Sequence, residues 1–398
     1  MNLLILNAGS SSLKFGVYAV DGGAAPRLLH RGAVEEIGRH GRFRILHTAD
    51  PAAREDRDLV VRDHHAALGL VLDWLEARGP GLALVAAGHR VVHGGPRFSG
   101  PVRVDRAVLE ALAELVPLSP LHQPHNLSAI HALVRLRPDL PQVACFDTAF
   151  HHTLPPVAQA FALPREMQAA GIRRYGFHGL SYQHIADVLP DHLGERADGR
   201  VVVAHLGNGA SLCAMKRRRS RETTMSFTPL DGIPMGTRCG ALDPGVLLYL
   251  MRERGMGLAE LTDLLHHRSG LLGLSGITCD VRELQESGVA YAREALELFA
   301  YKVAQAVAAL AAALEGLDAL VFTAGIGEHA APVRADICRR LGWLGLELDE
   351  AANAGHGPRI SRMDSAVSAW VIATDEEGVM ARQTWDLTRD GGAPVTPL

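Results

Sequence analysis

Two turns rich in glycine, serine and asparagine have the composition of phosphate-binding loops. They lie within residues 3–14 and 201–212, where each follows an apolar strand and leads back into apolar residues. Small residues let backbone N–H groups approach an oxyanion closely, and hydroxyl groups add further donors. Two such hairpins at corresponding positions predict a duplicated fold that closes on a nucleotide, and they indicate phosphoryl transfer.

Other nucleotide-binding motifs do not account for this chemistry. The chain has no GxxxxGK[ST] sequence, which excludes a P-loop NTPase. The Gly-Ile-Gly sequence at 325–327 is by itself too short to predict a dinucleotide site. The prediction of nucleotide binding therefore rests on the two hairpins.

Length, composition and charge favour a globular protein that acts on small molecules. The chain of 398 residues can form two or three domains, 47% of it is hydrophobic and 21% charged, and its formal net charge is -4. This charge, without a long basic face, favours neither nucleic acid nor an anionic membrane as a partner. The N-terminal residues lack the pattern of a secretory signal, so the expected location is the cytoplasm.

Three features that could indicate other classes of protein have simpler interpretations. The apolar stretch 296–314 contains Lys302 and Gln305 and is mostly alanine, which predicts a core helix rather than a membrane span. The five cysteines include no CxxC pair, which predicts buried free thiols rather than a zinc site or a disulfide framework. The basic run 216–219 is predicted to be a solvated hairpin tip, with binding of an anion as the alternative.

Alternating strands and helices must position these residues. In the first half, strands are predicted at 3–6, 13–18, 81–88 and 142–146, and helices near 66–77, 106–115 and 126–135. A polar loop is expected at 89–95, and Asp147 follows the strand 142–146. The second half begins again at 201, and its later elements are a helix with the apolar stripe Phe299, Val303, Val307, Leu310 and Leu314, a strand at 319–322, a turn at 325–328, a strand at 369–373 and a terminal helix.

This order predicts an α/β architecture with ligands beyond the strand ends. The expected domains are residues 1–148, to which 378–398 return, and residues 149–377, which would bind the nucleotide.

Five further motifs, taken with the hairpins, carry a resemblance to a known family. They are His-Arg-Val-Val-His-Gly-Gly at 89–95, Phe-Asp-Thr-Ala-Phe-His at 146–151, Tyr-Gly-Phe-His-Gly at 175–179, Met-Gly-Thr-Arg at 235–238 and Phe-Thr-Ala-Gly-Ile-Gly-Glu at 322–328. Together, from Asn7 to Glu376, the chain resembles the acetate kinase family. The resemblance implies a duplicated ribonuclease H-like fold, as in actin and sugar kinases, with a nucleotide cleft between two domains. It also implies a homodimer and phosphoryl transfer between ATP and acetate.

The resemblance assigns catalytic roles to four residues. Arg90 would hold the acetate carboxylate, while Arg238 and His178 would stabilise the transferring phosphoryl group. These residue types suit a loose transition state, because arginine keeps its charge and its planar fork matches both carboxylate and phosphoryl oxygens. Asp147 matches an aspartate regarded as a proton carrier, but acetate is already ionised near neutral pH, so orienting an arginine is the simpler role.

By the same resemblance, further residues would bind the substrates and the metal. The acetate methyl group would lie among Val92, Leu121, Phe177 and Pro229. The nucleotide, ATP or ADP, would contact Ser10, Ser12, Lys14, His205, Leu206, Gly207, Asn208, Gly209, Asp280, Val281, Arg282, Gly325, Ile326, Gly327, Glu328 and His329. Mg²⁺, or Mn²⁺ in its place, would be held through Asn7 and Glu376, since magnesium needs only one or two protein oxygens besides phosphates and water. For Glu376 the alternative is a favourable interaction with a helix N-terminus.

Three positions depart from the family pattern. Asp375 and His329 stand where the family often has asparagine, and the hairpin at 216–219 is more basic than usual. These differences concern the charge beside the metal and one ribose or adenine contact.

Two other functions remain as alternatives. A propionate or butyrate kinase would use the same residues and differ only in pocket volume. An actin-like or chaperone-like ATPase would hydrolyse ATP without acetate.

Overall fold

The computed structural model describes residues 1–21, 25–38, 40–48 and 54–389, and it divides into two compact units. Unit 1 comprises Met1–Phe150 together with the C-terminal segment from Asp375, and unit 2 comprises His151–Thr374. The division expected from the sequence fell at 148 and 377. Because helix α15 (Glu376–Thr388) belongs to unit 1 from its first turn, Glu376 lies in unit 1 and not in the C-terminal domain to which the expected boundaries assigned it.

Unit 1 is built on an eight-stranded sheet with the order β5-β4-β3-β2-β1-β6-β8-β7. Strands β1 to β5 form antiparallel neighbours, whereas β1, β6 and β8 run parallel. The strands are β1 (Asn2–Ala8), β2 (Leu13–Ala19), β3 (Arg27–Glu35), β4 (His40–His47), β5 (Arg54–Val60), β6 (Leu84–Val91), β7 (Val102–Arg103) and β8 (Gln142–Phe146).

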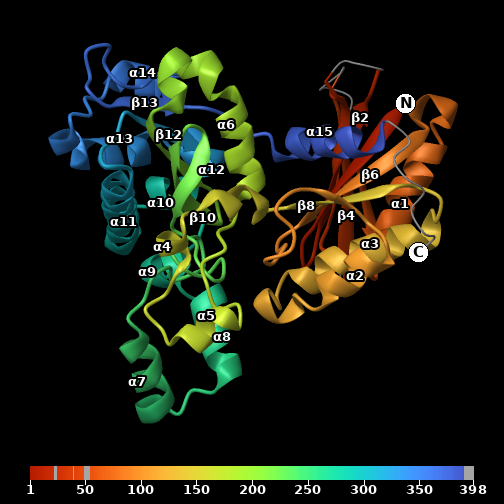
Figure 1. The fold of residues 1–398 in the computed structure, drawn as a ribbon, viewed down its shortest axis with the longest axis horizontal. Helices are drawn as coiled ribbons and strands as arrows, with labels where there is room; N and C mark the ends of the chain where they lie inside the picture. The colour runs from red at the N-terminus through yellow and green to blue at the C-terminus, as the bar shows by residue number, and fades with distance from the viewer. Residues whose placement is uncertain (22–24, 39, 49–53, 390–398) are drawn as a thin grey trace. The chain divides into compact units, whose positions relative to one another are not determined.

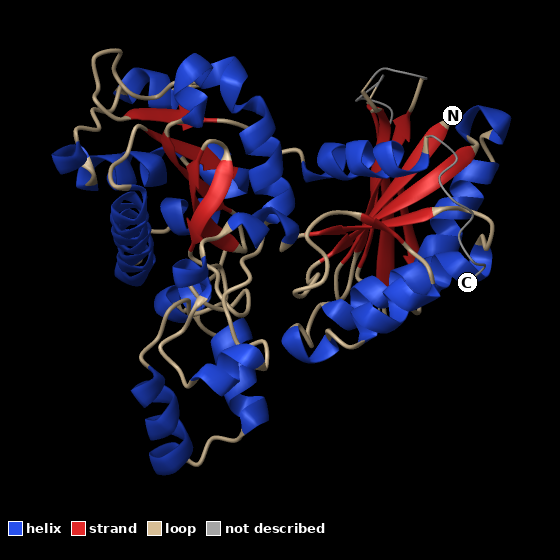
Figure 2. Cartoon of the chain, in the orientation of Figure 1, coloured by secondary structure: helices blue, strands red, loops and turns tan. Residues whose placement is uncertain are grey.

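Helices cover both faces of this sheet (Figures 1 and 2). Helices α1 (His64–Glu76) and α3 (Gln123–Leu136) pack side by side on one face, with α2 (Arg106–Ala113) beside α3. Their apolar residues, such as Leu68 and Leu133, join Leu4 and Phe15 of the sheet in one buried core. Helix α15 packs on the other face against β1, β6 and β8. At Gly88 the helix approaches so closely that a Cβ atom would collide with Thr384, which explains the glycine.

Unit 2 repeats the central strands of unit 1. Its sheet has the order β11-β10-β9-β12-β13, with β9, β10 and β11 antiparallel and β9, β12 and β13 parallel. This matches the order and directions of β3-β2-β1-β6-β8, so the predicted duplication and the α/β ribonuclease H-like fold are confirmed. The strands are β9 (Arg200–Leu206), β10 (Ala210–Lys216), β11 (Arg219–Thr223), β12 (Ala319–Thr323) and β13 (Ser368–Val371).

Helix α11 (Ala290–Leu314) is the central helix of unit 2. Its length and hydropathy would suit a membrane span, but the predicted stripe from Phe299 to Leu314 is buried against β9, β10 and helix α13. The prediction of a core helix is therefore confirmed. The other helices are α4 (Pro156–Gln159), α5 (Arg165–Ala169), α6 (Gly179–Leu193), α7 (Pro244–Arg254), α8 (Leu258–His267), α9 (Gly270–Ser275), α10 (Val281–Glu286), α12 (Ala324–His329), α13 (Ala331–Arg340) and α14 (Glu350–Ala354).

Short 3-10 helices complete the fold. They are η1 (Gly79–Leu82), η2 (Val116–Leu118), η3 (Ala149–Thr153), η4 (Gly194–Asp198) and η5 (Gly342–Leu344).

Helix η1 occupies the start of a segment that was predicted to be a strand. The predicted strand 81–88 begins only at Leu84 and continues to Val91, so Arg90 lies in a strand rather than in the expected loop.

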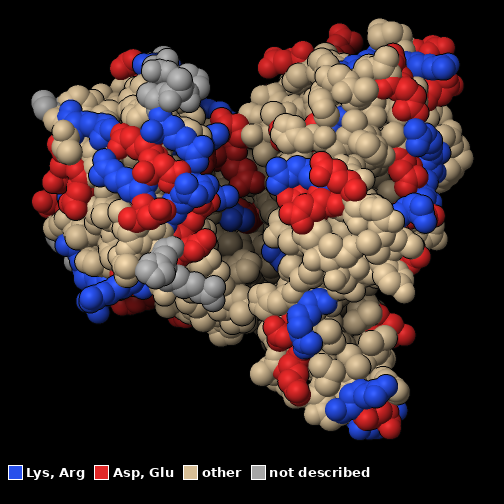
Figure 3. Space-filling model, turned by 180° about the vertical axis from the view of Figure 1, so that it is seen from behind, with Lys and Arg blue, Asp and Glu red and all other residues tan. Residues whose placement is uncertain are grey.

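The cysteines and the charged surface largely follow the predictions. All five cysteines are free, and burial raises the pKa of Cys145, Cys213 and Cys338 to about 12. Cys239 and Cys279 are only half-buried, so the expectation of burial was wrong for these two. The basic run 216–219 forms the exposed turn between β10 and β11, where Arg217 and Arg218 are left-handed. On the face drawn in Figure 3, basic and acidic side chains are interspersed.

Candidate active site

Three predicted site residues meet at one edge of the unit 1 sheet. Asn7 lies near the end of β1, Arg90 near the end of β6, and Asp147 directly after β8. These strands are parallel neighbours, so their carboxyl ends lie together, which is where ligands bind in open α/β sheets.

Arg90 is clamped by two of its neighbours. Its Nε and Nη2 atoms donate to the two carboxylate oxygens of Asp147 at 3.1 and 2.6 Å, and Nη1 donates to Asn7 Oδ1 at 3.2 Å. Burial alone would lower the pKa of Arg90, but the carboxylates of Asp147 and Glu376 raise it above its ordinary value. The Arg90 side chain is 22% exposed and that of Asp147 only 2%. The site therefore presents an oriented, permanently charged guanidinium of which part can still reach a ligand.

Glu376 adds a second carboxylate to this edge. Burial and the charges of Asp147 and Glu377 raise its pKa to about 7, against the opposing effects of Arg90 and Lys14. The N-cap of α15 is Asp375, whose Oδ1 accepts from the backbone N–H of Gly378 at 3.0 Å. Glu376 lies in the first turn, where the helix dipole favours a negative charge, but the capping hydrogen bond is made by Asp375.

The remaining unit 1 candidates lie in adjoining turns. Val92 directly follows β6 and is buried, while Leu121 is half-buried in the turn before α3. In the turn between β1 and β2, the Gly9 N–H donates to the Ser12 carbonyl at 2.8 Å. Ser10 is exposed in this turn, and Lys14 is exposed opposite Asn7 in the strand register.

In unit 2, His178 and Arg238 converge on one glycine. A Cβ atom on Gly209 would lie 3.4 Å from His178 Nε2 and 3.5 Å from Arg238 Nη2. His178 is left-handed, its Nδ1 lies 2.9 Å from Ser211 Oγ, and its ring stacks on His205 at 4.3 Å. The Ser211 contact and the stacking fix the ring, so Nε2 is directed to the place that Arg238 also reaches.

Arg238 is held by the loops around it. Its Nη1 donates to the Pro229 carbonyl at 2.8 Å, which brings Pro229 to the arginine. The Gly236 N–H donates to the Asn208 carbonyl at 3.0 Å, and no Cβ would fit there beside the Asn208 side chain. Phe177, next to His178, is buried, and its carbonyl accepts from His151 Nε2 at 2.9 Å.

Two of the three expected nucleotide segments follow parallel strands. The segment His205–Gly209 comprises the last two residues of β9 and the turn after it, and α12 follows the neighbouring strand β12. Leu206 is fully buried, whereas Gly325 and His329 are exposed.

The third expected segment begins α10. Asp280 is its N-cap and pairs with Arg282 at 2.6 Å, and the hydrogen bonds from Arg282 lower the pKa of Asp280 to about 2. Val281, between them, is buried.

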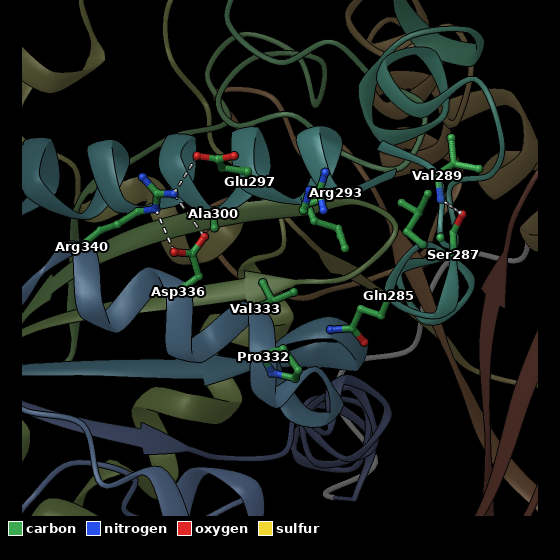
Figure 4. Close-up of a pocket in the computed structure, with 13 residues that line it drawn as sticks. Gln285, Ser287, Val289, Arg293, Glu297, Ala300, Pro332, Val333, Asp336 and Arg340 are labelled. Atoms are coloured by element: carbon green, nitrogen blue, oxygen red, sulfur yellow. Dashed lines mark hydrogen bonds and ion pairs between the residues drawn. The ribbon is translucent and has the colours of Figure 1, made fainter. Parts of the chain in front are cut away.

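A cavity of about 600 Å³ lies between α10, α11 and α13 (Figure 4). Leu284 and Val333 contribute apolar surface, while Arg340 on its wall pairs with Asp336 and Glu297. None of the residues predicted from the sequence lines this cavity. Two of its lining residues, Leu284 and Gln285, follow Asp280–Arg282 in α10. Two others, Pro332 and Val333, lie in α13, the next helix after α12 in the chain.

Comparison with known proteins assigns the chain to a family. A sequence model of the acetokinase family matches residues 2–382, and a protein of Rhodopseudomonas palustris described as acetate kinase is 55% identical over 98% of this chain and 99% of its own length. The chain belongs to the acetokinase family. Two solved acetokinase-like structures agree. A propionate kinase from Francisella tularensis has a TM-score of 0.91 at 36% identity, covering 97% of this chain and 99% of its own. The acetate kinase of Porphyromonas gingivalis has a TM-score of 0.87 at 34% identity, with the same coverage.

In this acetokinase, one polar residue that sequence reasoning missed connects the loops of the unit 1 site. Asn126 Oδ1 accepts from the backbone N–H of Val92 at 3.0 Å, and its Nδ2 donates to the Ala8 carbonyl at 2.9 Å. It therefore ties the loop after β6 to the end of β1. No local sequence pattern marks Asn126, because its burial and its distant partners come from the fold.

Proposed function

We propose that this acetokinase transfers the γ-phosphoryl group of ATP to acetate, reversibly and with magnesium, to give acetyl phosphate and ADP. The observation that carries the proposal is the clamped guanidinium of Arg90, followed two residues later in the chain by the buried Val92. A fixed cation next to an apolar side chain suits a small carboxylate with a short hydrocarbon tail.

The reaction is a direct in-line displacement. An acetate oxygen attacks the γ-phosphorus, the new O–P bond forms, and the bond from the γ-phosphorus to the β,γ-bridging oxygen breaks with its electrons left on ADP. Acetate is ionised near neutral pH, so no proton has to be removed. Asp147 accepts two hydrogen bonds from Arg90, which supports the role of an orienting carboxylate rather than a proton carrier.

His178 and Arg238 act on the transferring group. The phosphoryl oxygens carry the developing charge, and donors held in place by other contacts stabilise it without reorganisation. Ser211 and Pro229 provide such contacts for the two side chains. Gly209, which leaves space between them, is where we place an oxygen of the phosphoryl group.

Asn7 and Glu376 have the chemistry to hold magnesium. Both offer hard oxygen atoms, and both neighbour Arg90, Asn7 through a hydrogen bond and Glu376 through its charge. Burial is the main cause of the raised pKa of Glu376, and the charge of Asp147 adds to it, so a bound divalent cation would favour the ionised carboxylate. Among the described residues, no group of three or more His, Cys, Asp or Glu side chains is arranged to bind a metal. A bound Mg²⁺ would neutralise phosphate charge, and Mn²⁺ could take its place.

The nucleotide contacts follow the predicted segments. We propose that Ser10, Ser12 and Lys14 of unit 1 approach the phosphates, and that the turns at His205–Gly209, Asp280–Arg282 and Gly325–His329 of unit 2 line the nucleotide. The cavity between α10, α11 and α13 supports this, because Leu284 and Val333 give it apolar surface for a base and α10 connects it to the Asp280–Arg282 segment.

Propionate is the second candidate substrate, favoured by the similarity to the Francisella tularensis propionate kinase. We predict that Val92→Ala raises the propionate-to-acetate ratio of kcat/KM, because the change removes two methyl groups from the proposed pocket wall. One methylene in a hydrophobic pocket is worth about 1 to 3 kcal/mol, so wild-type discrimination should be roughly ten- to two-hundredfold. Initial rates with both acids at saturating magnesium-ATP measure the ratio. A ratio that is unchanged or lower in the variant would remove Val92 from the pocket, and a wild type that prefers propionate or butyrate would replace acetate as the substrate.

Trapping of the product tests the reaction itself. Hydroxylamine converts an acyl phosphate to a hydroxamate, so hydroxamate should accumulate only with ATP, magnesium and acetate together. ATP hydrolysis that is independent of acetate, without hydroxamate, would support an ATPase of the actin or chaperone type instead.

We further propose that the protein is a cytoplasmic homodimer. Helix α7 supports an interface, because it has no buried residue although it carries Leu248, Tyr249 and Met251, each about half exposed or more. A second copy would cover this apolar surface. Sedimentation velocity should give twice the mass of 42.7 kDa, and a monomer would contradict the proposal.

A further inference from the structure

Arg334 in α13 is the largest fully buried side chain in the described part of the chain, with 0% exposure. Sequence reasoning gave it no role. Taking a guanidinium out of water is costly, and burial lowers its pKa below the ordinary value. Among the residues that the structure describes, none of its hydrogen-bond partners is a carboxylate. A cation in such a position must be compensated by well-placed neutral acceptors.

Those acceptors belong to two segments. Nη1 donates to the carbonyl oxygens of Gly327 and Glu328, both at 2.9 Å. Nε donates to Asn353 Oδ1 at 2.9 Å and Nη2 to the Asn353 carbonyl at 2.8 Å, while Nη2 also lies 3.1 Å from His356 Nδ1. The carbonyls of Gly327 and Glu328 are in the last turn of α12, where a helix leaves its carbonyl groups without intrahelical partners. Arg334 thus fastens the end of α12 to α14.

Glu328, whose carbonyl oxygen accepts from Arg334, also holds the start of α12 through its side chain. Glu328 Oε1 accepts from the backbone N–H of Ala324 at 2.8 Å and from that of Thr374 at 3.2 Å. Ala324 has a φ of 65°, which is unfavourable for a residue with a Cβ atom and persists only where surrounding contacts enforce it. Thr374 is the last residue of unit 2 and precedes the segment that carries Glu376. One carboxylate therefore connects the start of α12 to the approach to Glu376.

We propose that Arg334 is a positioning residue for the nucleotide. It holds the backbone of Gly327 and Glu328 so that the exposed residues of α12 keep the shape that receives ATP and ADP, and so that Glu328 can hold Thr374. This inference rests on the proposed function, in which Gly325–His329 contact the nucleotide. Arg334 itself contacts no substrate in this proposal and acts only through the backbone of α12.

The experiment compares Arg334→Gln, Arg334→Lys and Asn353→Ala with Ile337→Ala. Ile337 is fully buried in the same helix, so its truncation destabilises unit 2 without removing an α12 hydrogen bond. We expect Arg334→Gln to raise the KM for ATP and the Kd for magnesium-ADP roughly tenfold, with acetate KM within about twofold of wild type. Arg334→Lys and Asn353→Ala should show the same change at about threefold, since each keeps some of the contacts. Ile337→Ala should lower the Tm and leave both nucleotide constants unchanged.

Magnesium-ADP binding, measured by calorimetry, does not require turnover, so it tests Arg334 even if the wild type forms no hydroxamate and the proposed reaction fails. If Arg334→Gln does not fold, Arg334→Lys and Asn353→Ala decide the matter. Wild-type nucleotide constants in the folded variants would overturn the inference. So would an equal weakening of acetate binding and nucleotide binding, or weaker nucleotide binding in Ile337→Ala.

Discussion

Arg238→Ala is expected to lower kcat by about a hundredfold or more, with a much smaller effect on the KM for acetate. Arg238 Nη2 and His178 Nε2 are directed to one position beside Gly209, and removal of a fixed donor to a developing oxyanion costs about 3 kcal/mol or more. Steady-state kinetics with both substrates varied will separate the two constants. Arg90→Ala should in contrast also raise the KM for acetate, because the resemblance assigns Arg90 to the carboxylate.

Arg268→Ala is the matched control for Arg238. Arg268 is an exposed arginine that pairs with Asp263, and its loss should leave kcat within about twofold of wild type, as for other surface ion pairs. Arg238→Lys keeps the charge but loses the planar fork, so it should fall between alanine and wild type. Near-normal kcat in folded Arg238→Ala would refute the assignment.

Glu376→Ala is expected to abolish most turnover and to shift the magnesium requirement upward. Glu376 is a half-buried carboxylate at the edge that holds Asn7 and Arg90, and it does not make the capping hydrogen bond of α15. Loss of one of the two proposed protein ligands should weaken the binding of Mg²⁺. The metal supplies much of the charge neutralisation in phosphoryl transfer. Initial rates over a magnesium titration at fixed ATP measure the effect.

Glu377→Gln provides the control one residue away. Glu377 pairs with Arg31 at 2.8 Å, so its loss removes a carboxylate from the same helix turn that is held in an ion pair and is not proposed to bind the metal. We expect a magnesium dependence close to that of wild type. If the magnesium dependence of Glu376→Ala is unchanged, Glu376 does not bind the metal, and its role is the favourable interaction with the N-terminus of α15.

The sequence by itself determined the features that depend on neighbouring residues. The apolar stripe of α11 and the strand Gln142–Phe146 were predicted from residue spacing, because a buried helix face and a fully buried strand leave local patterns. The two glycine- and serine-rich hairpins predicted the duplication, since each turn type is specified within a few residues. The ordered motifs indicated the family that the comparisons then showed.

Only the tertiary structure decided how the charged residues are accommodated. Arg90 was expected in a polar loop at 89–95, yet it lies within β6, where Asp147, 57 residues away, pairs with it. Burial of Arg334 likewise depends on acceptors in α12 and on Asn353, and Asn126 reaches across 118 residues to Ala8. A buried polar or charged group is stable only when its partners are in place, and partners this distant in sequence are brought together by the fold rather than by any local pattern.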